Sequence, residues 1–461
     1  MNSEHKFMNR RDFLKIVGIT TAAVGASMAG CTPKNNGTSG PTEVTGETEA
    51  GEMTVRVNNK KGDRVGLLGY GMMRLPTIPS EDKTKATIDQ EEVNRLVDYA
   101  MAHGVNYYDT SPVYVQGWSE ASTGLALKRY PRESFYIATK LSNMRNFSRE
   151  NSIEMYHKSF SELQVDYIDY YLLHSIGNGG LERFRERYVY NGMIEFLMAE
   201  REAGRIRNLG FSFHGTKETF DVVLAMDDYV HWDFVQIQLN YVDWTHATRN
   251  NVNADYLYGE LQKRNIQAVI MEPLLGGRLS KVPEHILTRL KQRDIDQSVA
   301  SWAFRFAGSP KGVLTVLSGM TFMEHLQENL QTYSPLKTLT DDDLVFLEET
   351  AQIMMSYPTI PCNDCKYCMP CPYGIDIPAV LLHYNKCVNE GNIATTSQSE
   401  NYRKARRAFL VGYDRSVPRL RQASHCIGCG QCLSHCPQSI DIPGELHRID
   451  NYVEDLKQNR I

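Results

Sequence analysis

The sequence predicts an α/β protein in which a (β/α)8 barrel is followed by a smaller, mainly helical domain rich in cysteine. The chain has 461 residues, which leaves room for a barrel of about 250 to 300 residues and a second unit. Short apolar runs alternate along most of the chain with segments of helical periodicity. Eight of the ten cysteines stand in two runs near the C-terminus, and none lies between Cys31 and Cys362. We expect the barrel over residues 53–338 and the cysteine-rich domain over 339–461.

The first 31 residues resemble an export signal. Residues 9–15 read Asn-Arg-Arg-Asp-Phe-Leu-Lys, and an uncharged apolar stretch follows over 16–30. That stretch is shorter than the about 20 apolar residues that span a bilayer. The paired arginines resemble the twin-arginine signal, which implies export of the folded protein. An ordinary amphipathic N-terminal helix is the alternative.

A flexible tether is expected after the signal. The sequence Met-Ala-Gly-Cys over residues 28–31 resembles a lipobox, in which Cys31 would carry a lipid anchor. Residues 32–52 are rich in Thr, Gly, Pro, Ser, Asn and Glu, and such a composition buries too little apolar surface to order itself. We therefore expect a periplasmic protein, or one anchored on the outer side of the cytoplasmic membrane.

Regular alternation of strands and helices begins near residue 53. Residues 53–57 and 65–68 flank a turn at 61–63 and predict a hairpin that leads into the first barrel strand. The apolar runs predict eight strands, at 67–72, 105–108, 135–138, 167–173, 206–211, 234–239, 268–271 and 313–317. The helical periodicity is clearest at 90–103, 149–163, 193–203, 255–264 and 297–307. A doubly wound open sheet fits this alternation almost as well, and the positions of the polar residues favour the barrel.

Reactive side chains follow three neighbouring strands. Asp109, Lys140 and His174 end the second, third and fourth strands, and Tyr114 lies in the loop after Asp109. In a (β/α)8 barrel the C-terminal strand ends share one rim, so we expect these groups to meet. Tyr114 would give a proton to a carbonyl oxygen, Lys140 would lower the pKa of Tyr114, and Asp109 would hold Lys140 in place. His174 would orient the carbonyl or share in proton transfer.

The order Asp109, Tyr114, Lys140, His174 resembles the catalytic tetrad of the aldo/keto reductases, and the resemblance spans residues 55–335. It implies an oxidoreductase that interconverts a small carbonyl compound and an alcohol with a nicotinamide coenzyme. Ser212, in Gly-Phe-Ser after the fifth strand, resembles the family serine that contacts the nicotinamide carboxamide. The further coenzyme contacts that the resemblance implies are Gln236, Ser318, Gly319, Glu328 and Asn329.

Three departures from the family pattern bear on the coenzyme. Phe213 stands where the family has asparagine, and Met271 stands where an aromatic residue usually stacks on the nicotinamide. Residues 312–335 contain no Lys or Arg for the 2′-phosphate of NADP. The choice between NAD and NADP therefore stays open.

The two cysteine runs predict iron–sulfur clusters. The second run has the ferredoxin spacing for a [4Fe–4S] cluster, and the first run differs by one residue in its last gap. Structural zinc would use two separated pairs of cysteines. The first cysteine run is Cys362, Cys365, Cys368 and Cys371, and the second is Cys426, Cys429, Cys432 and Cys436.

A ferredoxin-type domain with two [4Fe–4S] clusters is the resulting expectation. Each run is followed by a similar segment, 372–378 and 437–443, which indicates two related halves. By analogy with two-cluster ferredoxins, one cluster would bind the first three cysteines of the first run together with Cys436, and the other would bind the first three of the second run together with Cys371.

The net charge argues against a nucleic-acid partner, and the sequence leaves two functions open. The formal net charge is −5 with charges spread along the chain, so no basic face for nucleic acid is expected. We expect the clusters to exchange electrons with a redox partner protein, either a flavoprotein or a ferredoxin-like protein. The alternative is an electron-transfer or assembly protein whose barrel has lost catalysis.

Overall fold

The computed structural model describes residues 52–79, 87–247 and 251–461. The predicted signal, Cys31 and all but the end of the predicted tether lie outside the described residues. Within those ranges, no helix combines the length and the hydrophobicity needed to cross a membrane.

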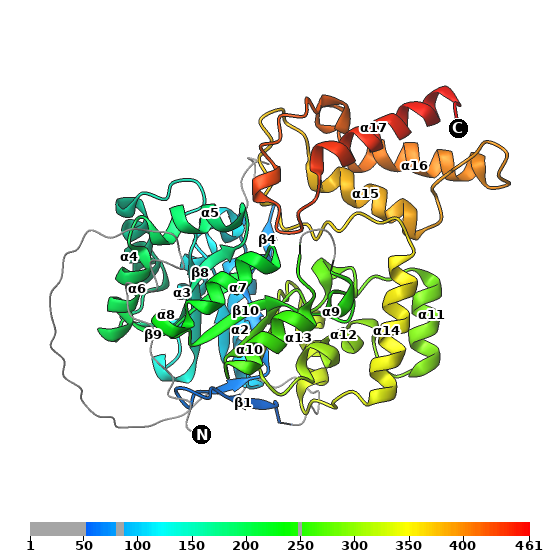
Figure 1. The fold of residues 1–461 in the computed structure, drawn as a ribbon. Coiled ribbons are helices and arrows are strands. Elements are labelled where there is room, and N and C mark those ends of the chain that lie inside the picture. Colours follow the sequence, from blue (N-terminus) through cyan, green and yellow to red (C-terminus); the bar gives the residue numbers. More distant parts are fainter. Residues whose placement is uncertain (1–51, 80–86, 248–250) are drawn as a thin grey trace, which may run out of the picture.

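Eight parallel strands close into a barrel, which confirms the predicted fold (Figure 1). They pair in chain order, and the last strand pairs with the first, so the open-sheet alternative is wrong. The strands are β3 (Leu68–Gly71), β6 (Tyr107–Asp109), β7 (Tyr136–Leu141), β8 (Ile168–Ile176), β9 (Ile206–Phe213), β10 (Phe234–Gln238), β11 (Gln267–Met271) and β12 (Val313–Ser318). Large side chains such as Tyr107, Tyr170 and Phe234 fill the interior.

The predicted hairpin lies at the N-terminal end of the barrel. Strands β1 (Val55–Val57) and β2 (Arg64–Gly66) pair antiparallel, and a second small ribbon joins β4 (Thr77–Ile78) to β5 (Thr87–Ile88). Asp63 accepts hydrogen bonds from Tyr170 inside the barrel and from Arg207. The hairpin thus closes the barrel at the end opposite the predicted catalytic residues.

Helices surround the barrel, and each of the five predicted helices is present within two residues of its expected start. The ring consists of α2 (Gln90–Ala102), α3 (Ser119–Leu127), α4 (Arg149–Leu163), α5 (Gly180–Phe184), α6 (Met193–Glu202), α7 (Lys217–Ala225), α8 (Asp227–Val230), α9 (Asp243–His246), α10 (Ala254–Lys263), α11 (Glu284–Arg293), α12 (Val299–Gly308) and α13 (Met323–Tyr333). Local chemistry sets their ends: Ser148 caps α4 through the Asn151 N–H, and Gln164 ends it in the left-handed conformation.

The next helix, α14 (Asp341–Met355), packs on the barrel. Thr340 and Asp343 form a capping box at its start, and Leu347 and Ala351 belong to the same apolar cluster as the barrel helices. The apolar packing of the barrel therefore continues through α14.

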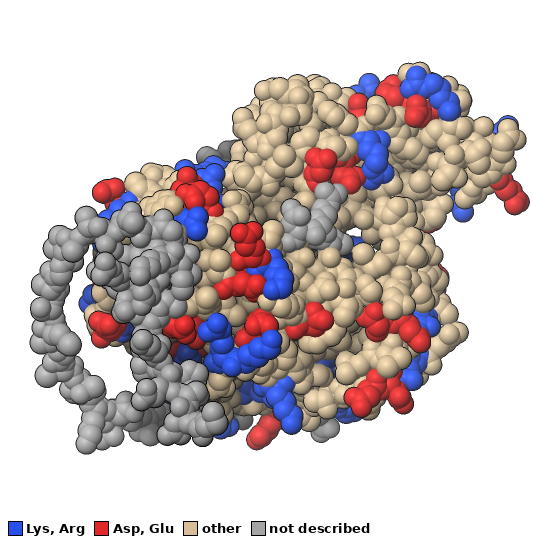
Figure 2. Space-filling model, in the orientation of Figure 1, with Lys and Arg blue, Asp and Glu red and all other residues tan. Residues whose placement is uncertain are grey.

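The C-terminal region is helical and has its own core, formed by α15 (Ile377–Asn389), α16 (Tyr402–Ser416) and α17 (Ile442–Gln458). The repeated Asp-Ile-Pro has one structural role in both halves. Asp376 caps α15 and Asp441 caps α17, each with proline in the first turn. In Figure 1 these helices lie at the end of the barrel opposite β1. Basic and acidic side chains are interspersed on the face shown in Figure 2.

Candidate active site and cluster sites

Asp109 and Lys140 form a buried ion pair at the C-terminal ends of β6 and β7. The Lys140 ammonium donates to Asp109 Oδ1 over 2.6 Å and to the Thr110 carbonyl over 2.8 Å. The other Asp109 oxygen accepts from Gln236 Nε2 over 3.2 Å. Burial lowers the pKa of Lys140 and raises the pKa of Asp109, and the opposite charge of each partner offsets part of that effect. The pair therefore keeps a cation beneath the catalytic end of the barrel.

Tyr114 and His174 lie beside this pair. The Lys140 ammonium is 4.8 Å from the centre of the Tyr114 ring, and the Tyr114 and His174 rings meet edge to face at 6.0 Å. His174 Nδ1 contacts the Ser142 hydroxyl at 2.5 Å. Burial, followed by the charges of Lys140 and Arg187, lowers the pKa of His174 well below its ordinary value, so the imidazole is neutral. The structure thus brings all four tetrad residues together.

Lys140 does not bring the pKa of Tyr114 below its ordinary value, as the sequence led us to expect, because burial outweighs the charge of Lys140. Burial raises the pKa of Tyr114 well above its ordinary value, and the neighbouring Tyr367 and Asp109 raise it further. The Lys140 ammonium lies 4.8 Å from the centre of the Tyr114 ring, and its hydrogen bonds go to Asp109 and Thr110. Tyr114 is therefore protonated at neutral pH, which suits a proton donor.

Tyr367 reaches this site from the C-terminal domain. It lies between Cys365 and Cys368 in the first cysteine run, and its hydroxyl is 3.4 Å from His174 Nε2. The Tyr114 and Tyr367 hydroxyls also share a hydrogen bond, in which either phenol can donate. The rings of His174 and Tyr367 meet edge to face at 6.2 Å. A residue of the second domain thus completes the polar cluster of the first.

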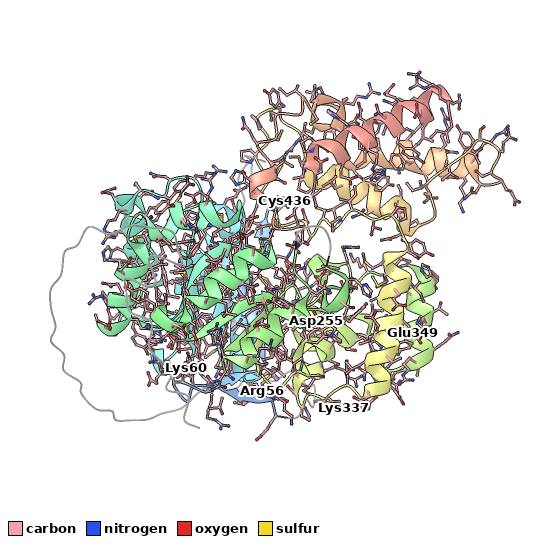
Figure 3. All side chains as sticks on the ribbon, in the orientation of Figure 1. Arg56, Lys60, Asp255, Lys337, Glu349 and Cys436 are labelled. Atoms are coloured by element: carbon pink, nitrogen blue, oxygen red, sulfur yellow. The ribbon has the colours of Figure 1, made fainter. Side chains whose placement is uncertain are left out.

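Two further contacts hold the cysteine runs against the barrel. The Asn363 carbonyl accepts from Arg74 Nη2 over 2.8 Å, and a Cβ built on Gly276 would lie 2.1 Å from Asn363 Cβ. Gln438, which follows the second run, donates to Gln238 Oε1 at the end of β10 over 3.0 Å. Figure 3 places Cys436 at the junction between barrel and helices. The cysteine runs therefore cover the catalytic end of the barrel.

Among the described residues no group of three or more Cys, His, Asp or Glu side chains lies in metal-binding geometry, but electrostatic interactions divide the eight cysteines of the two runs into two sets. Burial, with a contribution from Cys436, raises the pKa of the Cys362 thiol to about 11 and that of Cys365 to about 12. Cys436 and the same two cysteines also raise the pKa of Cys368. This grouping of three cysteines from the first run with Cys436 is the one that the ferredoxin analogy implies.

The second set surrounds Cys432. Burial raises the pKa of its thiol to about 11, and Cys426, Cys429 and Cys371 raise it further. A cavity of about 560 Å³ lies among the cysteines of this set and Cys368. Cys429 is exposed, whereas Cys362 and Cys436 in the other set are buried. The two sites therefore differ in their access to solvent.

The aldo/keto reductase family profile matches residues 67–351, which include the whole tetrad. The chain belongs to the aldo/keto reductase family. A 4Fe-4S dicluster domain profile matches residues 361–440, so this family oxidoreductase carries a dicluster domain after its barrel.

Individual relatives support the same assignment. L-galactose dehydrogenase of Arabidopsis thaliana is 25% identical over 321 residues, which cover 65% of this chain and 94% of that protein. D-arabinose 1-dehydrogenase of Saccharomyces cerevisiae is 35% identical over 128 residues, covering 25% of this chain and 35% of the yeast protein. An aldo-keto reductase structure from Bacillus halodurans matches with a TM-score of 0.53 and 22% identity, covering 65% of this chain and 96% of that one. An aldo-keto reductase from Klebsiella pneumoniae in complex with NADPH matches with a TM-score of 0.50 and 18% identity, covering 65% and 94%. These two structures support the fold alone.

The residues that the aldo/keto reductase pattern assigns to the coenzyme form two groups. Ser212 and Gln236 are in register on neighbouring strands β9 and β10. Ser212 Oγ accepts from the Ser175 N–H over 2.7 Å, and Phe213 packs its ring 4.9 Å from Phe220. These donors therefore line the catalytic end, while Phe213 belongs to the apolar core.

The second group lies at the end of β12. Asn329 Nδ2 donates to Ser318 Oγ over 3.0 Å, Gly319 is exposed, and Glu328 is half-buried on α13. A Cβ on Gly319 would lie 3.3 Å from the side chain of Arg74. The aliphatic part of Arg74 thus packs on Gly319, while its guanidinium is bonded to Asn363 and Asp364 of the first cysteine run.

Sequence reasoning missed three residues at this end of the barrel. Arg74 follows β3. Pairing of β12 with β3 places the ends of these two strands side by side, so a prediction of barrel closure could have identified Arg74. Glu272 follows β11 with φ +57 and is half-buried, desolvation raises its pKa, and its side chain bonds Asn363. Tyr367 gave no signal, because its role depends on how the two domains pack.

Proposed function

We propose that the barrel interconverts a small carbonyl compound and an alcohol with NAD or NADP, while the two clusters exchange electrons with a partner protein. The observation that carries the proposal is the buried Asp109–Lys140 pair beneath a protonated Tyr114, with neutral His174 beside it. Each group has an assignable part in proton transfer to an oxygen atom.

The chain's own residues bind, orient and protonate the substrate. The Tyr114 hydroxyl donates its proton to the carbonyl oxygen, and His174 orients that oxygen. The Lys140 ammonium, 4.8 Å from the Tyr114 ring, stabilises the tyrosinate that remains. Asp109 keeps Lys140 charged and in place. Proton release from the alcohol follows the same path in reverse.

The donor set at the catalytic end fits a nicotinamide coenzyme, which supplies a hydride when bound. Ser212 and Gln236 would hold the carboxamide end, and Ser318, Gly319, Glu328 and Asn329 would hold the adenosine end. The NADPH bound in the Klebsiella pneumoniae structure favours NADP, and the absence of Lys and Arg from 312–335 favours NAD. We keep both.

The eight cysteines fit two [4Fe–4S] clusters, which carry single electrons. The exposed set around Cys429 is the site where we expect the redox partner to dock. Three apolar side chains near it are also exposed, Leu420 at 81%, Ile427 at 63% and Leu433 at 43%. Exposed apolar side chains at an electron-transfer site favour a protein partner. We expect this partner to be a flavoprotein or a ferredoxin-like protein. A flavoprotein would link the one-electron chemistry of the clusters to two-electron chemistry.

Coenzyme binding tests the proposal directly. NADH, NAD⁺, NADPH and NADP⁺ are titrated into anaerobic, signal-free protein with both clusters loaded, and cluster absorbance is followed throughout. We expect micromolar binding of one pair, and loss of turnover in Tyr114→Phe with unchanged iron content. No binding by any of the four, with none co-purifying, would favour an electron-transfer or assembly protein with a catalytically inactive barrel.

We also propose export through the twin-arginine route, supported by residues 9–31 of the sequence. Replacing Arg10 and Arg11 together with lysine should retain the protein in the cytoplasm, as fractionation measures. Cys31→Ser should abolish incorporation of labelled fatty acid if Cys31 carries the anchor. Export of the double-lysine variant at the normal level would contradict the proposal.

A further inference from the structure

The Tyr367 hydroxyl lies where the proposed reaction needs an oxygen atom. A substrate carbonyl must accept a hydrogen bond from Tyr114 and lie next to His174. The Tyr367 hydroxyl is 3.4 Å from His174 Nε2, the two rings meet edge to face, and the hydroxyl is hydrogen-bonded to that of Tyr114. A phenol oxygen and a carbonyl oxygen are both acceptors, so the two compete for one donor.

The first cysteine run holds Tyr367 in this position. Cys365 and Cys368, on either side of it, belong to the buried cluster site, and Asp364 and Lys366 adopt left-handed backbone angles with φ +53 and +63. Such angles are uncommon for residues other than glycine and turn the chain sharply. The loop therefore directs Tyr367 into the barrel while its cysteines face the cluster site.

The contacts that keep this loop in place include one long ion pair and hydrogen bonds from Arg74 and to Glu272. Arg74 donates to the Asn363 carbonyl over 2.8 Å, and its ion pair with Asp364 is long, at 3.9 Å, and partly exposed. An exposed pair of this kind contributes about 0 to 1 kcal/mol. Local opening of the loop is consistent with bonds of this strength.

We propose that Tyr367 occupies the carbonyl subsite as an internal substitute for substrate, so that substrate binds only when the first cysteine run withdraws Tyr367. The inference rests on the proposed function of Tyr114 and His174. It makes Tyr367 an active-site residue contributed by the cluster domain, and it links access to the barrel to the state of the first cluster's loop.

Removal of the Tyr367 side chain tests the inference by ligand binding. The chain is used signal-free with both clusters loaded, and iron is counted in every variant. Tyr367→Ala should leave a cavity that takes 4-methylphenol, which is the tyrosine side chain cut at Cβ, because buried apolar cavities bind small aromatic molecules. Calorimetry should detect this binding in Tyr367→Ala and not in wild type or in Tyr373→Ala, a control that truncates a solvent-exposed tyrosine near the same run.

The hydroxyl partners are tested by comparing 4-methylphenol with toluene. Toluene should bind Tyr367→Ala about tenfold more weakly, since it lacks the hydrogen bond to Tyr114. Adding Tyr114→Phe to Tyr367→Ala should reduce this preference. Equal binding of both ligands, or no binding to iron-replete Tyr367→Ala, would overturn the assignment.

Competition with substrate is tested with benzaldehyde as the probe. Its affinity, measured by calorimetry, should rise from wild type to Tyr367→Phe to Tyr367→Ala, because a closed site lowers apparent affinity by the fraction that is open. If Tyr367→Ala fails to retain iron, the test rests on Tyr367→Phe. A benzaldehyde affinity of Tyr367→Phe equal to that of wild type would refute the proposal. Binding of 4-methylphenol without turnover in any variant would leave the inference standing and the proposed catalysis refuted.

Discussion

Breaking the Asp109–Lys140 pair should destabilise the barrel strongly. The side chains are 4% and 1% exposed, so Lys140→Met leaves the Asp109 carboxylate buried without its cation. Removing one partner of a buried ion pair costs about 3–5 kcal/mol. The Gln236 amide still donates to Asp109, which places our expectation at the lower end, about 3 kcal/mol.

The double variant Asp109→Leu/Lys140→Met should regain most of this stability. Replacing both charges with apolar groups removes the uncompensated carboxylate, so its free energy of unfolding should lie within about 2 kcal/mol of wild type. Both variants should lack carbonyl reduction, because each lacks the cation that stabilises the Tyr114 tyrosinate. The double variant would then regain stability without regaining activity.

Urea unfolding under anaerobic conditions is the assay. Trp232 and Trp302 are buried in the barrel and report its unfolding by fluorescence. Arg95→Met is the matched control, because it breaks an exposed pair with Glu92 and should cost less than about 1 kcal/mol. A loss below about 1 kcal/mol in Lys140→Met, or a double variant less stable than the single one, would refute the reasoning.

Three other changes have defined outcomes. Burial raises the pKa of Glu120 to about 7 from 4.5, so the stability it contributes is complete below pH 4.5 and is lost as pH rises through about 7. Glu120→Gln should remove about 3 kcal/mol of pH dependence from the unfolding free energy between about pH 4.5 and 7, and an unchanged pH dependence would contradict the raised pKa. Gly276→Ala should loosen the first cysteine run and speed its amide hydrogen exchange, whereas Gly62→Ala, also at positive φ but with nothing within 4 Å, should leave that exchange unchanged. Cys429→Ser and Cys371→Ser should each lose the same cluster, so the electron paramagnetic resonance spectra of the two variants should match. Spectra that show a different cluster remaining in each variant would contradict the ligand grouping.

Most of the fold could be predicted because it depends on local patterns. Apolar runs and helical periodicity located all eight barrel strands and the five named helices. Closure of the barrel could not be predicted from local patterns. It depends on the pairing of β12 with β3, which joins residues such as Val316 and Leu68 that are far apart in the sequence. The reactive residues at the strand ends were the evidence for a closed barrel, because a barrel brings them to one rim.

The active site could be predicted in its composition but not in its electrostatics. Asp109 and Lys140 follow neighbouring strands, so their contact follows from the topology. The raised pKa of Tyr114 is caused first by burial and then by Tyr367, a residue that is 193 positions from His174 in sequence. Packing between domains of this kind leaves no periodic signal in a single sequence.

The two ends of the barrel are closed by bonds of different strength, and this difference supports an opening at one end only. At the hairpin end, Arg207 pairs with Asp63 at 2.6 Å and with Asp169 at 2.8 Å, and both carboxylates are buried. At the catalytic end, the Tyr367–His174 and Gln438–Gln238 contacts, at 3.4 Å and 3.0 Å, join neutral groups, and Arg74 adds a hydrogen bond to Asn363 and a long, partly exposed ion pair with Asp364. Neutral hydrogen bonds contribute about 0.5–1.5 kcal/mol each and an exposed ion pair about 0–1 kcal/mol, whereas a buried carboxylate that loses its cation costs more than either. Thermal opening should therefore expose Tyr114 and His174 long before it disturbs the hairpin, so the cluster domain can act as a removable cover on a barrel that is otherwise permanently closed.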